Sequence, residues 1–123
     1  MVRCLNEELR PSFAGGRVTE IFSEEDLQEV TKQNEGTVIG IYFYRAWCTP
    51  CKKLTPVYES LADQYNTIVL LKMDGLGDLG SRFGADGYPT FVFLKNGKFL
   101  FSFDRGNENT LRQVANEPIT LFT

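Results

Sequence analysis

The stretch Trp47-Cys48-Thr49-Pro50-Cys51, which closely follows the apolar run Val38–Tyr44, decides the fold class of this chain. Two cysteines separated by two residues can close a small disulfide without distorting the surrounding fold, and such a pair is typical of a redox couple. The apolar run has the pattern of a buried strand, whereas residues 52–65 have the apolar spacing of a helix. The cysteines are therefore predicted to lie where a strand ends and a helix begins.

This position predicts different roles for the two cysteines. A helix N-terminus carries about half a positive charge and has unpaired N–H groups. That field favours a thiolate, so Cys48 is predicted to be the nucleophile at neutral pH. Cys51 lies one helical turn further along and is predicted to be the resolving thiol. The alternative for both is a buried structural cysteine.

The composition of the chain excludes several function classes. With 123 residues the chain is predicted to form one domain, and its 42% hydrophobic content supplies a core. The net charge is −3 without a basic patch, so nucleic acid is not expected as a partner. No apolar run approaches the roughly 20 residues of a membrane span. Residues 1–10 carry charges where a signal peptide would be apolar, so a cytoplasmic location is expected.

The absence of histidine removes most catalytic and metal-binding alternatives. Cys–His proteases, Ser–His–Asp hydrolases and zinc sites that contain histidine all require that side chain. Three cysteines are too few for a four-cysteine zinc site within one chain. One metal alternative stays open, a zinc site shared between two chains to which Cys48 and Cys51 contribute half. Otherwise no metal and no bound cofactor are expected.

The rest of the chain predicts alternating strands and helices. Residues 1–16 are predicted to be an N-terminal extension, with Cys4 as a free thiol or, alternatively, in a regulatory disulfide. Residues 17–123 are predicted to form the domain. Strands separated by helices imply parallel pairs, and Asn96-Gly97 predicts an antiparallel hairpin. Strands are predicted at 17–22, 38–44, 67–74, 90–95 and 98–103, and helices at 23–36, 52–65, around 79–83 and at 107–118.

This arrangement resembles the thioredoxin family over roughly residues 17–116. The resemblance rests on Trp-Cys-x-x-Cys-Lys at 47–52, on Gly-Tyr-Pro-Thr at 87–90 and on matching single positions. It implies the α/β thioredoxin fold, with a central mixed sheet of about five strands flanked by about four helices. The single positions are a proline inside the helix (Pro56), an acid closing the third strand (Asp74), the hairpin turn at 96–97 and a glycine before the last helix (Gly106).

The resemblance also implies a chemistry and a substrate surface. It implies a thiol–disulfide oxidoreductase that reduces protein disulfides and is recharged by a flavin-dependent thioredoxin reductase. Pro89 corresponds to the family's cis-proline, which packs against the cysteines. The backbone of Tyr88 would then pair with the substrate chain. Trp47, Thr49 and Pro50 would contact the substrate. The alternatives are that Trp47 is a packed aromatic and that Pro50 is a favoured helix-start residue.

Three departures from the family pattern leave other functions open. Thr-Pro separates the cysteines where reductases often have Gly-Pro. Tyr42 stands where thioredoxins usually bury an aspartate, and Leu70 where the partner lysine would be. Tyr88 before the proline is similar to disulfide isomerase domains and supports an isomerase or oxidase as one alternative. The missing aspartate and lysine support the other alternative, a binding module with little turnover. Tyr42 and Lys52 are possible modulators of the cysteines, or else a core aromatic and a solvated helix residue.

Overall fold

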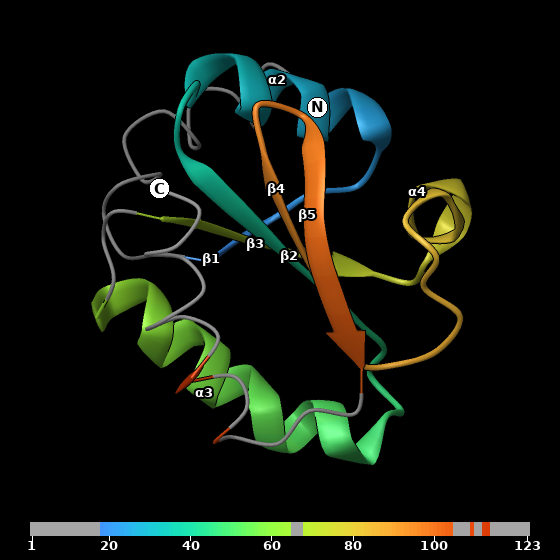
Figure 1. Cartoon of the computed structure of the whole chain (residues 1–123). Helices are drawn as coiled ribbons and strands as arrows, with labels where there is room; N and C mark the ends of the chain where they lie inside the picture. The colour runs from blue at the N-terminus through green and yellow to red at the C-terminus, as the bar shows by residue number, and fades with distance from the viewer. Residues whose placement is uncertain (1–17, 65–67, 105–108, 110–111, 114–123) are drawn as a thin grey trace.

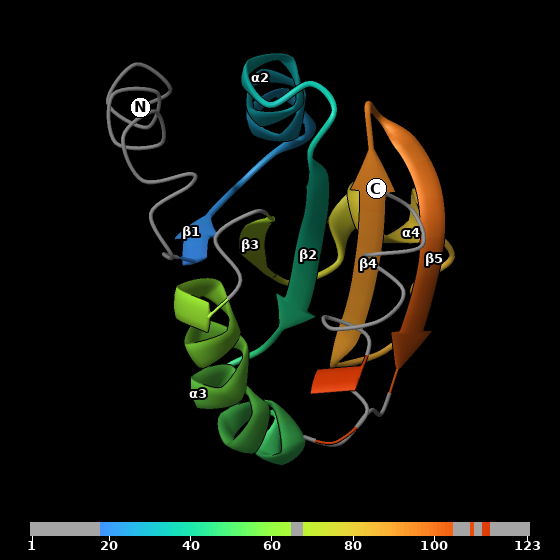
Figure 2. The same ribbon diagram turned by 60° about the vertical axis from the view of Figure 1, so that its left-hand side comes forward.

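The computed structural model of the chain describes residues 18–64, 68–104, 109 and 112–113. A mixed five-stranded sheet with the strand order β1-β3-β2-β4-β5 forms its centre (Figures 1 and 2). Helix α3 covers one face of the sheet, and α2 and α4 cover the other. The elements are β1 (Val18–Glu20), α2 (Glu24–Gln33), β2 (Val38–Tyr44), α3 (Thr49–Gln64), β3 (Val69–Asp74), α4 (Gly77–Arg82), β4 (Thr90–Lys95) and β5 (Lys98–Asp104).

Strand β2 lies at the centre of the sheet and is buried on both faces, as its continuous apolar pattern predicted. Successive side chains of a strand point to opposite faces. Val38 and Tyr42 therefore pack in the core under α3, whereas Ile39, Ile41 and Phe43 pack in the core under α2 and α4. In β3 only the first half is buried, whereas Lys72 and Met73 are half-buried and Asp74 is exposed.

The direction of β4 differs from the prediction. Strands β1, β3 and β2 are parallel, as expected, but β4 runs antiparallel to β2 although α4 precedes it. Helix α4 has six residues, so it does not return the chain along the length of the sheet. Strand β3 ends at Asp74 beside Tyr44, and β4 starts at Thr90 beside Phe43, at the same end of the sheet. The chain therefore re-enters from the end at which it left.

The helix boundaries agree with the predicted ones in part. Ser23, the first residue of the predicted helix 23–36, caps α2, because its Oγ accepts the N–H of Asp26 at 3.2 Å. Helix α2 ends at Gln33 rather than near Gly36. The structure defines three helices in the part of the chain that it describes, against about four predicted. Most of the predicted helix at 107–118 and the whole extension 1–16 lie outside the described residues. No described helix is both long and apolar enough to span a membrane.

A β-bulge in the final hairpin changes the face on which one aromatic residue lies. The Asn96-Gly97 turn forms as predicted, with φ of 54° and 80°. Phe101 pairs with Phe93, but Phe99 pairs with Leu94, so one extra residue stands in β5. Phe99 therefore stacks on Phe83 on the opposite face from Phe101 and is 49% exposed. Without the bulge, the alternation of side chains along a strand would place Phe99, Phe101 and Phe103 on one face.

Gly40 is required where the central strand meets two large side chains. A Cβ at this position would lie 2.9 Å from Cε2 of Phe93 and 3.0 Å from Cδ2 of Leu70. The Phe93 ring is stacked on Phe101 and cannot move away freely. Overpacking of this kind costs about 1–3 kcal/mol, partly offset by the reduced entropy of the unfolded chain.

We therefore expect Gly40→Ala to lower the free energy of unfolding by about 1–2 kcal/mol in urea denaturation. Gly87→Ala is the matched control, because a Cβ there meets no atom within 4 Å. The steric explanation would be wrong if both substitutions changed the unfolding free energy equally.

Candidate active site

The two cysteines lie at the start of α3, beyond the C-terminal end of β2. Helix α3 begins at Thr49, two residues earlier than Cys51, so Cys48 immediately precedes the helix and Cys51 lies in its first turn. The cysteines form a disulfide with their Cα atoms 5.2 Å apart. The backbone N–H of Cys51 donates to Sγ of Cys48 at 3.1 Å. The first turn contains no acidic residue, so nothing there offsets the positive end of the helix beside Cys48.

The residues around the disulfide differ sharply in exposure. Cys48 is 4% exposed and Cys51 1%, whereas Trp47 is 68% exposed. Thr49, Pro50 and Lys52 are also exposed. The disulfide thus lies at the edge of the core under α3, directly beneath a surface formed by its sequence neighbours.

The loop before β4 contacts the same region. The Tyr88–Pro89 peptide bond is cis, the geometry implied by the resemblance. The Tyr88 ring meets the Trp47 ring edge-on at 5.7 Å between centroids. The Tyr88 hydroxyl accepts the N–H of Leu76 at 3.0 Å. The Tyr88 side chain therefore joins the Trp47 segment, the loop after β3 and the proline loop, a contact among three distant segments that no local sequence pattern signals.

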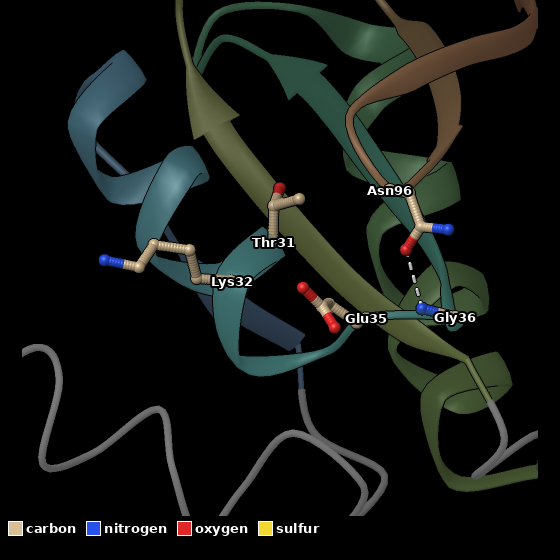
Figure 3. Close-up of a pocket in the computed structure, with 5 residues that line it drawn as sticks. All are labelled: Thr31, Lys32, Glu35, Gly36 and Asn96. Carbon is tan, nitrogen blue, oxygen red and sulfur yellow. Dashed lines mark hydrogen bonds between the residues drawn. The ribbon is translucent and has the colours of Figure 1, made fainter.

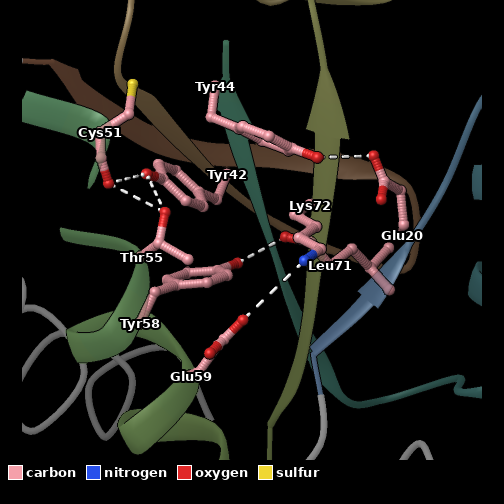
Figure 4. Close-up of polar contacts among 9 residues, drawn as sticks. All are labelled: Glu20, Tyr42, Tyr44, Cys51, Thr55, Tyr58, Glu59, Leu71 and Lys72. Carbon is pink, nitrogen blue, oxygen red and sulfur yellow. Dashed lines mark hydrogen bonds and ion pairs between the residues drawn. The ribbon is translucent and has the colours of Figure 1, made fainter. Parts of the chain in front are cut away.

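Tyr42 reaches the cysteine pair from beneath the helix (Figure 4). Its side chain is fully buried, and its hydroxyl donates to the carbonyl oxygen of Cys51 at 2.9 Å. Thr55 Oγ1 lies 2.9 Å from the same carbonyl and 2.9 Å from the Tyr42 hydroxyl. Tyr42 is thus both a core aromatic and a partner of Cys51. Thr55 was not among the predicted site residues, although its place four residues after Cys51 puts both on one helix face.

Lys72 does not replace the lysine that the resemblance would place at position 70. Leu70 is buried in the core under α3, and Lys72, two residues later, lies 3.8 Å from Glu59 and 5.8 Å from the centre of the Tyr44 ring. The Tyr44 hydroxyl donates to Glu20 at 2.7 Å. Figure 4 shows the Tyr44–Glu20 contact, which joins β2 to β1, and the Lys72–Glu59 contact, which joins β3 to α3.

Two buried tyrosines, Tyr42 and Tyr58, and the half-buried Tyr44 predict an alkaline limit to the stability of the protein. Burial raises the pKa of Tyr58 well above its ordinary value of 10, raises the pKa of Tyr44, where the hydrogen bond to Glu20 adds to it, and raises the pKa of Tyr42. In the unfolded chain these phenols ionise near pH 10. Raised folded-state values favour the neutral phenols in the fold, so their contribution is complete below pH 10 and is lost as pH rises above it.

We expect the free energy of unfolding to fall steadily above pH 10, and Tyr58→Phe to make this fall less steep. Denaturant unfolding between pH 7 and 11.5, with absorbance at 295 nm to follow phenolate formation, measures both. Native-state ionisation of every tyrosine near pH 10, without loss of stability, would contradict this expectation.

A surface hollow lies at the other end of the sheet from the cysteines and is separate from them (Figure 3). It is an open surface depression between the end of α2 and the β4–β5 turn, where Asn96 Oδ1 accepts the N–H of Gly36 at 2.7 Å. The hollow is lined by Thr31, Lys32, Glu35, Gly36 and Asn96. Among the described residues, no three side chains of the types that bind metals converge there or at the cysteines.

Comparison with known proteins identifies the family. A family model described as thioredoxin matches residues 18–117. Thioredoxin-1 of Caenorhabditis elegans is 32% identical over 101 residues, which cover 80% of this chain and 88% of that protein. The X-ray structure of Fasciola hepatica thioredoxin superposes with a TM-score of 0.75 and 28% identity, covering 86% of this chain and all of that one.

A chain in the crystal structure of the ferredoxin: thioredoxin reductase and thioredoxin f2 complex superposes with a TM-score of 0.74 and 26% identity. It covers 80% of this chain and 92% of that one. These similarities favour disulfide reduction over the isomerase and binding-module alternatives. The chain therefore belongs to the thioredoxin family and is a thiol–disulfide oxidoreductase that acts on protein disulfides through Cys48 and Cys51.

Proposed function

We propose that Cys48 is the attacking thiolate and Cys51 the resolving thiol of a protein-disulfide reductase. The observation that carries the assignment is the hydrogen bond from the Cys51 N–H to the Cys48 sulfur at an N-terminal turn without acidic residues. Both features stabilise negative charge on Cys48. Cys51 lies inside the first turn of α3 and is buried next to Cys48. This position suits it to attack the Cys48 sulfur within the protein rather than to attack the substrate directly.

The reaction then proceeds in two exchanges. The Cys48 thiolate attacks one sulfur of the substrate disulfide, a mixed disulfide forms, and the first substrate thiolate leaves and takes up a proton. Cys51 loses its proton and attacks Sγ of Cys48, which closes the Cys48–Cys51 disulfide and releases the second substrate thiolate. Two electrons pass from the protein dithiol to the substrate, and the disulfide seen in the structure is the product state.

We assign the substrate surface to the residues exposed around the disulfide and to the proline loop. Trp47, Thr49 and Pro50 provide exposed contact area beside Cys48. The Tyr88 side chain is engaged with Leu76 and Trp47, so its contribution to substrate is through the backbone, next to Pro89. Lys52 adds positive charge near Cys48 and is proposed as a modulator of the thiolate.

We propose a flavin-dependent thioredoxin reductase as the electron donor and the cytoplasm as the location, where this chain would serve electron transport to protein disulfides. A reductase must be returned to its dithiol form, and the reducing cytosol supports that cycle. The similarity to thioredoxin f2 in its complex supplies a second candidate, a ferredoxin-dependent reductase. Comparing reduction of the Cys48–Cys51 disulfide by each purified system decides between the two donors.

The test of this function is reduction of insulin disulfides by dithiothreitol with and without the protein. We expect marked acceleration by the wild-type protein and none by Cys48→Ser, because the variant lacks the attacking thiolate. Turbidity of the released insulin B chain gives the rate. Equal rates with wild type and variant would reject disulfide reduction through Cys48.

A further inference from the structure

A buried pair of hydroxyl groups joins the first turn of α3 to the central strand. The Tyr42 hydroxyl from β2 and the Thr55 hydroxyl from α3 each lie 2.9 Å from the carbonyl oxygen of Cys51, and 2.9 Å from one another. Figure 4 shows both side chains converging on this carbonyl, which faces away from the sulfur of the same residue. Because Tyr42 is 0% exposed, solvent does not reach this side of the contact. The backbone of Cys51 is thereby tied to the sheet.

This tie acts where the helix itself is weakened. Pro56 lies inside α3 and has no N–H, so the carbonyl of Lys52 cannot receive the usual intrahelical hydrogen bond. The first turn is therefore held to the rest of the helix by one bond fewer. Contacts from outside the helix then contribute more to fixing the position of that turn.

The core fixes the position of the Tyr42 hydroxyl. Its ring stacks on Phe91 with centroids 4.9 Å apart and planes within 4° of parallel, and it also meets Tyr58 at 5.0 Å. Burial raises the pKa of Tyr42, so the phenol stays protonated and remains a donor at neutral pH. The hydroxyl therefore occupies one place and remains a hydrogen-bond donor to the Cys51 carbonyl oxygen.

We propose that Tyr42 is a positioning residue for the second exchange of the reaction. Its hydroxyl, with that of Thr55, holds the Cys51 peptide group so that the Cys51 sulfur stays aligned with the bond between Cys48 and the substrate. In the mixed disulfide Cys48 is bonded to substrate, and the disulfide bond to Cys48 no longer restrains Cys51. The tie to β2 is then the contact that keeps it in place. The inference rests on the proposed roles of the two cysteines.

The test separates the two exchanges in a pair of matched variants. Tyr42→Phe removes the hydroxyl that reaches Cys51. Tyr58→Phe removes an equally buried hydroxyl that bonds to the carbonyl of Leu71 at 2.8 Å, away from the cysteines. Each reduced variant is mixed with insulin and quenched with acid, and the mixed disulfide is quantified by mass spectrometry. The rate of attack is measured separately for each substitution in a Cys51→Ser background.

We expect Tyr42→Phe to slow the decay of the mixed disulfide about 3- to 10-fold, the effect of losing one hydrogen bond. Attack by Cys48 should be unchanged, and Tyr58→Phe should alter neither rate. Thr55→Val should also slow the decay of the mixed disulfide. Normal decay in Tyr42→Phe, or equal slowing in Tyr58→Phe, would overturn the inference. Failure of the wild-type protein to reduce insulin would instead reject the proposed function.

Discussion

Replacing Cys51 with serine should leave the protein covalently attached to its substrates through Cys48. The serine hydroxyl cannot displace a thiolate from the mixed disulfide, so the second exchange stops. Intramolecular attack by a well-placed group corresponds to very high effective concentrations, roughly 10⁵–10⁸ M in the best cases. We therefore expect release by an external monothiol at millimolar concentration to be at least about 1,000-fold slower than release by Cys51.

Non-reducing electrophoresis of Cys51→Ser after incubation with insulin measures this adduct. Cys48→Ser is the control, and it should form no comparable adduct, because Cys51 is 1% exposed and lies inside the first turn of α3. Adducts that formed equally with both variants would show that either cysteine can attack. The assignment of roles would then be wrong, although the redox pair would stand.

Phe91→Ala should produce the largest loss of stability among single substitutions in the aromatic core under α3. Phe91 is 0% exposed and stacks on Tyr42 at 4.9 Å and on Phe103 at 5.0 Å. Truncation of a buried phenylalanine to alanine costs about 3–5 kcal/mol, from lost burial and the cavity that remains. Domains of this kind are stable by about 5–15 kcal/mol, so the variant should approach the limit of folding.

Guanidinium denaturation followed by circular dichroism measures the change, and Phe99→Ala is the matched control. Phe99 is 49% exposed and stacks on Phe83 at 6.2 Å, so its truncation should cost less than about 1 kcal/mol. Equal losses for Phe91 and Phe99 would show that the bulge in β5 does not separate the two rings as the structure indicates.

These two phenylalanines show when the alternation of residues along a strand predicts the sheet face on which a side chain lies, and when it does not. Alternation along a strand assigns faces correctly as long as the pairing register is unbroken, which it is in β2 and β4. A single extra residue in β5 reverses the assignment for everything before it, and Phe99 lies before it. The antiparallel direction of β4 was missed for a similar reason, because it depends on where the connecting chain crosses the sheet.

The candidate site also combines features that the local sequence predicts with contacts that only the tertiary structure forms. The strand, the helix start, the cysteine spacing and the Asn96-Gly97 turn are each encoded within a few neighbouring residues, so they could be predicted. The contact of Tyr42 with the Cys51 carbonyl needs β2 to lie under α3 in one register, and the contact of Tyr88 with Trp47 and Leu76 needs three loops to meet.

The sequence by itself thus determined the redox pair, the order of most elements and the family that the chain resembles, because these depend on local spacing and residue type. Only the tertiary structure decided what surrounds the pair. It placed a neutral hydroxyl against the backbone of Cys51 and committed the Tyr88 side chain to the protein rather than to substrate. Those contacts join segments far apart along the chain, and their formation depends on packing between elements rather than on the pattern within any one of them.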